Sequence, residues 1–277
     1  LGSIHTVLGA SGGVGRAVVA ELKSKGLMVR TVERKPDVPG DETVSADMKI
    51  KQDAYRAIKG SSHVYCCIGL PYDSRVWAVD WPEVLQNVMD ACLTENAVLV
   101  FLDNIYMYGP APLSVPFTEE HDQHPVTKKG MIRKQLANMI FEAIEKRGLK
   151  AVIGRSADFY GPHALNSFFY INFLDRMLTG KAPQSLLTPG IGRTYANVAD
   201  NGRALVALAL APDTYGQVWH LPASAPVTIE EALAVFNRQL GTSFKVSFMP
   251  KPLLAILSLF ITPLRELKEM LYQFQTP

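Results

Sequence analysis

Three glycines near the amino terminus have the spacing most directly linked to chemistry. Gly9, Gly12 and Gly15 stand between an apolar run, residues 4–8, and an amphipathic run, residues 14–25. In that context the first glycine permits a sharp turn, the second lets the backbone approach a pyrophosphate, and the third lets a helix pack close to a sheet. Backbone N–H groups at the helix start would then face the phosphates. The residues expected to contact a dinucleotide here are Gly9, Ala10, Ser11, Gly12, Gly13, Val14 and Gly15. The alternative is a tight strand–helix turn in another kind of α/β protein.

A second group of candidate residues follows the apolar run 97–102. Asn104, Tyr106 and Tyr108 alternate, so in an extended segment all three point to the same side. That side lies past the carboxyl end of an expected parallel strand, where ligands bind in open α/β sheets. A phenol can exchange a proton and an amide can hydrogen-bond an oxygen. Tyr106 is therefore a candidate acid and Asn104 a candidate substrate ligand, with substrate contact or simple packing as the alternatives for Tyr106.

The elements that must position these residues alternate along the chain. Apolar runs predict strands at 4–8, 27–32, 44–48, 63–68, 97–102 and 150–153, and helical spacing predicts helices at 14–25, 55–59, 82–94 and 131–146. This alternation is typical of a Rossmann-type α/β fold with a doubly wound parallel sheet. The rhythm loosens beyond residue 160, where helices are expected at 167–178, at 197–210 and after a capping box at Thr228. We expect an NAD(P)-binding domain over 1–160 and a smaller substrate-binding portion over 161–277, interleaved with the end of the sheet.

The end of the second expected strand bears on the choice of cofactor. It should lie beside the adenosine ribose, where an acidic residue suits the 2′-hydroxyl of NAD and a guanidinium suits the 2′-phosphate of NADP. Arg34, with Lys35 next to it, occupies the expected position. Glu33 is acidic, but in an alternating strand it faces away from Arg34. The sequence favours NADP, with NAD as the alternative and a solvated basic turn as the interpretation without a cofactor.

Composition restricts the class of protein. The 277 residues are 48% hydrophobic and 19% charged, and the net charge of +2 implies no broad basic face for nucleic acid. Three cysteines without a CxxC pair are typical of reduced thiols in a cytoplasmic protein. The longest apolar stretch, residues 253–261, is far shorter than the roughly 20 residues of a membrane span. We expect it to form a core or lid helix, with contact at a membrane surface as the alternative. The histidines at 121 and 124 lack a second half-site, so no metal is expected.

Several motifs together resemble the short-chain dehydrogenase/reductase superfamily, in its extended or atypical branch, the NAD-dependent epimerase/dehydratase family. They are the glycine turn, Asp47-Met48, Cys67-Ile68-Gly69-Leu70, Tyr108-Gly109, Arg155 with Phe159-Tyr160-Gly161-Pro162, and Tyr195-Ala196-Asn197-Val198-Ala199-Asp200. The resemblance implies a nicotinamide cofactor and a homodimer formed through the helices at 82–94 and 131–146. Further cofactor contacts are expected at Asp47, Met48, Ile68, Gly69, Leu70, Ser156, Ala157 and Asp158. Substrate contacts are expected at Pro71, Tyr72, Tyr108, Tyr160 and Tyr195.

The proton-handling residues of that superfamily are changed in this chain. The superfamily uses Tyr-x-x-x-Lys, which places both side chains on one face of a helix. Lys134 falls on the lysine and is expected to bind the nicotinamide ribose, but Gly130 falls on the tyrosine and Asn104 on the usual Ser or Thr. A bacterial subgroup resembles the chain in lacking this tyrosine. It shares Asp103-Asn104-x-Tyr106-x-Tyr108-Gly109 and Lys129-Gly130-x-x-Arg133.

Two functions follow from this pattern. The first is a nicotinamide-dependent oxidoreductase, or an epimerase or dehydratase, that acts on a small hydroxyl- or carbonyl-bearing molecule such as a sugar or nucleotide sugar. In it, Lys134, Tyr106 and Asn104 are the expected catalytic residues. The second is a non-catalytic NAD(P)-binding sensor or regulator that has lost the tyrosine acid. Glycine in place of the tyrosine favours the second, and the tyrosines of residues 104–108 favour the first.

Overall fold

Seven parallel strands form one sheet in the computed structural model, in the order β3-β2-β1-β4-β5-β6-β10. The structure describes residues 3–109, 113, 115–186 and 189–271. The strands are β1 (Ile4–Leu8), β2 (Met28–Glu33), β3 (Glu42–Ser45), β4 (Ser61–Cys66), β5 (Val98–Asp103), β6 (Ala151–Arg155) and β10 (Val218–His220). The order of the first six strands is that of dinucleotide-binding sheets, with its reversal between β1 and β4. The predicted doubly wound parallel sheet is confirmed.

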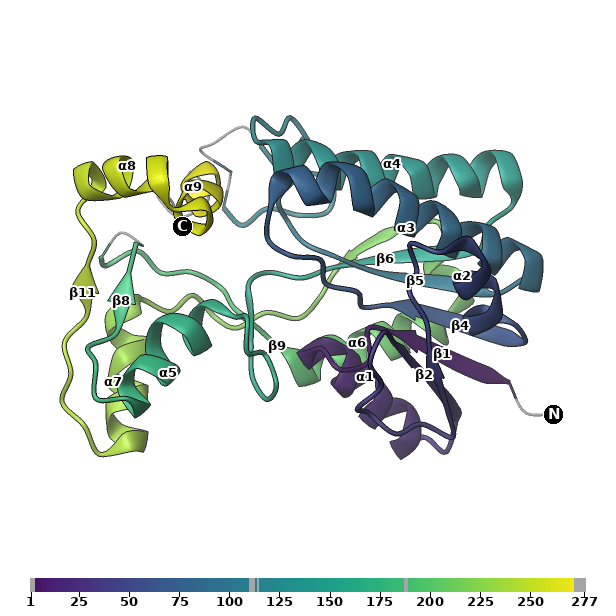
Figure 1. The fold of residues 1–277 in the computed structure, drawn as a ribbon, viewed down its shortest axis with the longest axis horizontal. Coiled ribbons are helices and arrows are strands. Elements are labelled where there is room, and N and C mark those ends of the chain that lie inside the picture. The colour runs from purple at the N-terminus through teal and green to yellow at the C-terminus, as the bar shows by residue number, and fades with distance from the viewer. Residues whose placement is uncertain (1–2, 110–112, 114, 187–188, 272–277) are drawn as a thin grey trace.

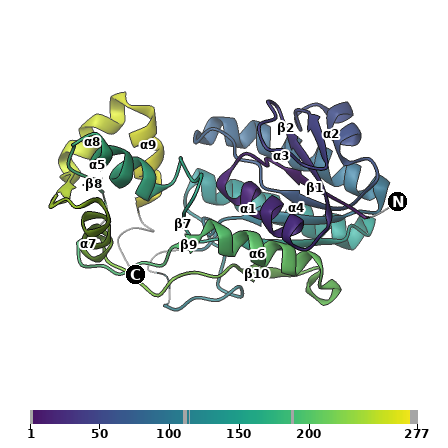
Figure 2. The ribbon, with the colours of Figure 1, turned by 90° about the horizontal axis from the view of Figure 1, so that it is seen from below.

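Helices cover both faces of the sheet (Figures 1 and 2). They are α1 (Gly13–Ser24), α2 (Lys51–Ile58), α3 (Ser74–Glu95), α4 (Lys128–Arg147) and α6 (Val198–Ala209). α1 and α6 pack together on one face, and α2, α3 and α4 lie on the other. α3 begins at Ser74, so Pro82 stands inside the helix and the prediction that it opens the helix was wrong. The helix begins earlier because the Asp73 carboxylate accepts a hydrogen bond from the Arg75 N–H at 2.8 Å. The dimer expected through α3 and α4 stays a prediction.

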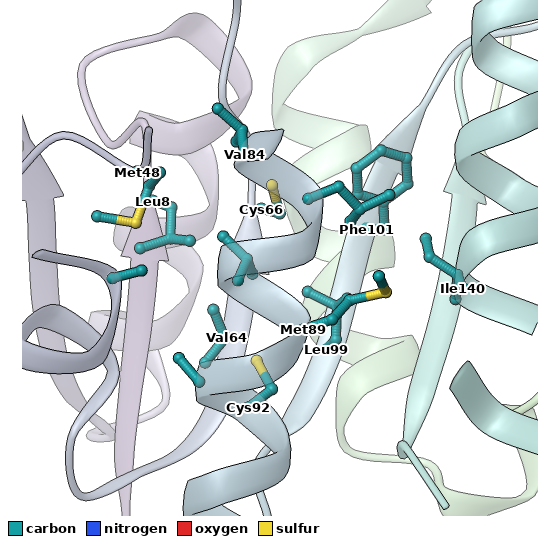
Figure 3. Close-up of a cluster of buried hydrophobic side chains, with 14 of the residues drawn as sticks. Leu8, Met48, Val64, Cys66, Val84, Met89, Cys92, Leu99, Phe101 and Ile140 are labelled. Atoms are coloured by element: carbon teal, nitrogen blue, oxygen red, sulfur yellow. The ribbon is translucent and has the colours of Figure 1, made fainter. Parts of the chain in front are cut away.

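Two apolar clusters fix the sheet between these helix layers. On the α3 side, alternate residues of β4 and β5, such as Val64, Cys66, Leu99 and Phe101, pack under α3 (Figure 3). The intervening residues of the same strands pack toward α1 and α6. Strands buried on both faces explain why their sequences read as continuous apolar runs.

A stacked histidine pair bridges two central strands. His5 of β1 is 1% exposed, its ring lies 4.5 Å from that of His63 on β4, and its Nδ1 is 3.1 Å from the Tyr65 hydroxyl. Burial disfavours the imidazolium and, with the neighbouring His63, lowers the pKa of His5 from 6.5 to about 4. The folded protein therefore holds His5 neutral where an unfolded chain would protonate it.

Acidification from pH 6.5 to 4 is expected to cost about 3 kcal/mol of unfolding free energy through His5. In this window the unfolded state binds more protons than the folded state, so stability falls as pH falls. Urea unfolding at a series of pH values measures the loss. His5→Gln keeps a polar partner for Tyr65 but does not titrate, so it should lose less stability over the same window. Equal pH dependence in both proteins would contradict the assignment.

A second lobe gathers most of the later chain on one side of the sheet (Figure 1). It holds a π-helix (Tyr170–Leu174), α5 (Asp175–Leu178), β8 (Gln184–Ser185), α7 (Ile229–Leu240), β11 (Ser247–Phe248), α8 (Lys251–Phe260) and α9 (Thr262–Glu269). The short strands β7 (Phe159–Tyr160) and β9 (Ala196–Asn197) pair where the chain leaves the sheet. The capping box at Thr228 is confirmed. The Thr228 hydroxyl accepts from the Glu231 backbone N–H, and the Glu231 carboxylate accepts from the Thr228 backbone N–H. α6 and β10 return to the sheet between parts of this lobe.

The apolar stretch 253–261 falls mainly in α8. Its outward residues include Leu259 and Phe260, which are exposed. None of the helices that the structure describes is both long and apolar enough to cross a membrane.

Candidate functional site

The glycine turn joins β1 to α1 at the point where the strand order reverses. Gly9 has φ +77°, and a Cβ there would lie 2.7 Å from the Cys67 carbonyl oxygen, so both conformation and space require glycine. A Cβ on Gly15 would lie 2.2 Å from the Gly9 carbonyl oxygen. The predicted structural roles of Gly9 and Gly15 are confirmed. A Cβ on Gly12 would make only an ordinary contact at 3.5 Å. Nothing in the described chain requires glycine there, and room for a pyrophosphate stays a prediction.

Glu33, not Arg34, faces the glycine turn. Glu33 ends β2, is 9% exposed, and its carboxylate interacts with the Ser11 side chain. Burial is the largest cause that raises the pKa of Glu33, and Asp37 raises it further. Arg34 points to solvent, as does Lys35. β2 ends at Glu33, one residue later than predicted, and its last inward side chain is this carboxylate. The contact expected between Arg34 and the cofactor stays a prediction.

Loops after neighbouring strands meet at the same edge of the sheet. Cys67 donates from its N–H to the Leu8 carbonyl at 2.9 Å, which brings the chain after β4 against the chain after β1. Met48 is buried beside Leu8 (Figure 3), and its carbonyl accepts from the Asn87 amide at 3.0 Å. The expected residues at this edge are Asp47, Met48, Ile68, Gly69 and Leu70. The structure brings them to the carboxyl ends of β3 and β4, and their contacts with a cofactor stay predictions.

Residues 104–108 form a turn rather than an extended segment. The Asn104 Oδ1 accepts from the Tyr106 N–H at 3.0 Å, and the Ile105 carbonyl accepts from the Tyr108 N–H at 3.3 Å. The prediction that Asn104, Tyr106 and Tyr108 point to one side was wrong, because an asparagine side chain that bonds to the backbone two residues on closes a local turn.

Tyr106 points toward the start of α3. Its ring stacks near Trp77, with 6.4 Å between ring centroids, and its phenol lies close enough to that of Tyr72 for each to affect the pKa of the other. Tyr72 keeps 40% of its surface exposed, so a ligand can reach this corner. Burial raises the pKa of both phenols. The protonated forms prevail, and the pair can donate a proton. Pro71 supports this corner, because its carbonyl accepts from the Trp77 indole at 2.9 Å.

Tyr108 lies in the core. It is fully buried, and its hydroxyl is 2.8 Å from Arg155 Nη1 and 2.7 Å from His220 Nε2. Asp103 continues this network, since its two carboxylate oxygens pair with Arg133 and Arg155. The structure therefore does not bring Tyr108 to the crevice wall, where a substrate contact was expected.

The inward face of α4 carries Lys129 and Arg133. Lys129 is fully buried, with its ammonium 4.3 Å from the centroid of the Tyr72 ring. Arg133 is 3% exposed and pairs with Asp103 at 2.6 Å. Lys134 lies one residue around the helix, where its ammonium donates to the Gln123 carbonyl at 2.6 Å. The structure does not bring Lys134 to Tyr106.

Gly130 lies where α4 touches the 104–108 turn. A Cβ there would lie 2.5 Å from the Tyr106 carbonyl oxygen and 2.7 Å from Pro125 Cβ. The glycine is thus a close-packing residue, and a side chain at this position would collide with the turn that presents Tyr106.

Gly130→Ala is expected to lower the unfolding free energy by about 1–3 kcal/mol, because the added methyl group forces α4 away from the turn. Gly130→Tyr should destabilise at least as much and should not supply the absent superfamily tyrosine. Urea unfolding measures both. Met131→Ala, on the exposed side of the same turn, serves as the control with a small effect. A Gly130→Ala protein as stable as the wild type would contradict this packing.

The residues after β6 lead from the sheet toward the second lobe. Ser156 is buried, and its hydroxyl accepts from the Asn201 amide at 2.8 Å and donates to the Ala157 carbonyl at 2.7 Å. Burial raises the pKa of Asp158, whereas the nearby Arg193 lowers it. The cofactor contacts expected of Ser156, Ala157 and Asp158 stay predictions.

Tyr160 and Tyr195 stand around the same Phe169 ring. The centroid of that ring is 6.3 Å from that of Tyr160 and 4.5 Å from that of Tyr195. Burial is the main cause that raises the pKa of Tyr195 to about 12. These expected residues lie at the junction of the two lobes, and their roles stay predictions.

Four residues were not among the candidate site residues of the sequence analysis: Lys129, Arg133, Arg193 and Glu266. Lys129 and Arg133 entered it only as part of the motif shared with the subgroup. The spacing gave a signal for two of them, because Lys129 and Arg133 share the helical face of the buried Ile132, Leu136 and Ile140. Glu266 approaches Lys129 from α9, and no local pattern reports that contact.

A nicotinamide dinucleotide fits the crevice by two tests. The Oε1 atom of Glu33 is buried and has no hydrogen-bond partner within the described ranges, which suits a ribose hydroxyl donor. Gly12 precedes α1 as its N-cap and offers no capping side chain, so an anion can approach the N–H groups of the first turn. Among the described residues, no cluster of three or more His, Cys, Asp or Glu side chains could hold a metal ion.

Solved structures of sugar-nucleotide enzymes have a similar fold. UDP-N-acetylglucosamine 4-epimerase from Bacillus cereus is 19% identical with a TM-score of 0.77, over 89% of this chain and 85% of that one. UDP-glucose 4-epimerase from Thermus thermophilus, in complex with NAD, is 23% identical with a TM-score of 0.72, over 88% and 85%. DesIV, a dTDP-glucose 4,6-dehydratase from Streptomyces venezuelae, is 17% identical with a TM-score of 0.77, over 90% and 85%.

No curated protein matches the chain. One family model does, under the description "NAD dependent epimerase/dehydratase family", and its match extends over residues 5–221. That range runs from β1 through β10 and so includes the whole sheet, the glycine turn and α4. The chain belongs to the NAD dependent epimerase/dehydratase family.

Proposed function

We propose that the chain is an enzyme that uses NAD to oxidise and reduce a hydroxyl-bearing carbon of a nucleotide sugar. The observation that carries this proposal is the pair of neighbouring phenols of Tyr72 and Tyr106 next to Trp77. The pair stands past the carboxyl end of β5, the end at which open α/β sheets bind ligands, in a chain with Gly130 in place of the superfamily tyrosine. A protonated phenol at this place supplies the acid that a sensor would not need.

The position of Glu33 favours NAD over NADP. A carboxylate that faces the glycine turn can accept hydrogen bonds from both hydroxyls of an adenosine ribose. A 2′-phosphate at that place would meet a buried negative charge, and burial weakens the screening of that repulsion. Arg34 points to solvent and offers only a partial counter-charge. This reverses the preference that the sequence pattern suggested.

The substrate class follows from the second lobe and from the similar structures. Those structures are described as epimerases and dehydratases of UDP- and dTDP-sugars, some with NAD bound. In this chain Arg193 approaches Asp158 and Tyr195 at the junction of the lobes. A guanidinium there suits the diphosphate of a nucleotide sugar. We assign the sugar to the space between this junction and Tyr72.

The proposed reaction needs one group that transfers the hydride and another that transfers the proton. The bound nicotinamide would accept a hydride from the sugar carbon and return it. As the hydride leaves, the hydroxyl proton must pass to a base, and as it returns, an acid must protonate the carbonyl oxygen. Tyr106, beside Tyr72, would accept the hydroxyl proton as the phenolate, the form that the Arg133 charge favours, and would return that proton as the phenol. The Oδ1 atom of Asn104 is bonded within the turn, and its NH₂ group orients the sugar oxygen.

Calorimetry with NAD and NADP, followed by turnover assays on UDP-glucose, UDP-N-acetylglucosamine and dTDP-glucose, tests the proposal. We expect NAD to bind more tightly than NADP and at least one sugar nucleotide to be epimerised or dehydrated. Binding of NAD without conversion of any of the three, while sugar nucleotides still bind, would favour a regulator over an enzyme.

A further inference from the structure

The helix α9 lies on the side of the second lobe that is turned toward α3 and α4 (Figure 1). Glu266, which is 4% exposed, accepts from the Ser74 N–H at 2.9 Å and from the Ser74 hydroxyl at 3.2 Å. Glu269 accepts from the backbone N–H groups of Lys128 and Lys129. Two carboxylates of one short helix thus bond to two helices of the Rossmann domain.

Lys129 is the cation that both carboxylates share. Its ammonium pairs with Glu266 Oε2, lies 3.4 Å from Glu269 Oε2, and donates to the Glu266 backbone carbonyl at 3.2 Å. The same ammonium stands 4.3 Å from the centroid of the Tyr72 ring. A buried ammonium without these acceptors would be unstable, so α9 is what holds Lys129 in place beside Tyr72.

We propose that Lys129 is the charged residue that acts on the Tyr72–Tyr106 pair and that Glu266 is its positioning residue, so the second lobe completes the acid–base end of the site. This inference rests on the proposed function. It assigns to Lys129 the electrostatic task expected of Lys134, whose ammonium is bonded to the Gln123 carbonyl instead. It also gives α9 a part in the chemistry rather than in folding alone.

The two substitutions should act on the phenols in the same direction if Glu266 positions Lys129. Removal of the Lys129 ammonium should raise the pKa of the phenol pair, because a cation favours the phenolate. Glu266→Gln should raise it as well, because Lys129 is then no longer held beside Tyr72. If Glu266 acted through its own charge alone, its removal would lower the pKa of Tyr72 instead. The charged and titratable groups that face the pair are Lys129 and Arg133 from α4, Asp158 after β6, and Glu266 and Glu269 from α9.

The decisive experiment compares pH profiles of kcat for Lys129→Met and Glu266→Gln. We expect the profile to move up by about one pH unit in Lys129→Met and, by a smaller amount, also up in Glu266→Gln, with the Kd for NAD unchanged in both. Lys128→Met removes the same charge from an exposed neighbour in the sequence and should leave the profile in place. The double variant Lys129→Met/Glu266→Gln leaves no unpaired buried charge, so it replaces Lys129→Met if that protein does not fold.

A downward shift in Glu266→Gln, or a shift in Lys134→Met in place of Lys129→Met, would overturn the inference. A second readout does not need turnover. Amine acylation followed by mass spectrometry should find Lys129 protected in the wild type and labelled at least about tenfold faster in Glu266→Gln. Equal labelling would show that Glu266 does not hold Lys129. A wild type that binds NAD but converts no sugar nucleotide would refute the proposed function, while the labelling result still decides the position of Lys129.

Discussion

Tyr106→Phe is expected to lower turnover of the sugar nucleotide by about 10²- to 10⁴-fold, the usual contribution of a positioned general acid or base. The substitution removes one oxygen atom and keeps the ring that stacks near Trp77. The Kd for NAD and the unfolding free energy should therefore change little. Steady-state kinetics, with calorimetry for NAD, measure the two effects separately.

A matched control is available in Tyr215. Its hydroxyl is also bonded, at 2.6 Å to the Ala209 carbonyl, but it lies at the end of α6 away from the crevice. Tyr215→Phe should lose a little stability and no turnover. If Tyr106→Phe kept more than half of the wild-type kcat, Tyr106 would not be the proton-handling residue.

Glu33→Ala is expected to weaken NAD binding by about 10- to 100-fold, the effect of losing a hydrogen bond to a charged acceptor in a buried place. NADP binding should weaken far less or improve, because the buried negative charge that faces its 2′-phosphate is gone. Parallel calorimetric titrations of the two cofactors give the ratio. Arg34→Ala is the control, and it should leave NAD affinity unchanged. Loss of NAD binding in Arg34→Ala but not in Glu33→Ala would restore the preference that the sequence alone suggested.

The same carboxylate predicts how NAD affinity depends on pH. Ribose hydroxyls bind the ionised form of Glu33, so affinity is full above the pKa of Glu33 and is lost as pH falls through it. Because burial raises this pKa, the loss should begin at a higher pH than for an ordinary glutamate. Titrations of wild type over the acidic range should show the decline, and Glu33→Ala should be nearly flat.

The strength of the local patterns decided which parts of the fold the sequence could predict. Apolar strands that alternate with amphipathic helices specify a parallel sheet, and Gly9 and Gly15 are required by conformation and close packing. Those features are local and were predicted. α3 was placed too late because a proline usually opens a helix, whereas here Asp73 caps an earlier start.

The candidate site was harder to predict because a shift of one residue along a strand or helix changes which side chain faces the site. Whether Glu33 or Arg34 faces the cofactor depends on where β2 ends, and whether Lys129 or Lys134 faces the crevice depends on one step around α4. For α4 the hydrophobic periodicity does indicate which lysine faces inward, because Lys129 lies on the face of the buried Ile132 and Leu136. The pairing of Glu266 with Lys129 joins residues 137 positions apart and has no local signal.

The most direct test of the central claim is to follow the near-ultraviolet absorbance of reduced nicotinamide when UDP-glucose, UDP-N-acetylglucosamine or dTDP-glucose is added to the NAD-loaded protein. We predict that the absorbance of reduced cofactor appears with at least one of these sugars in the wild type and is absent in Tyr106→Phe. A wild-type protein that binds both NAD and the sugar nucleotides, yet never reduces the cofactor, would contradict the account.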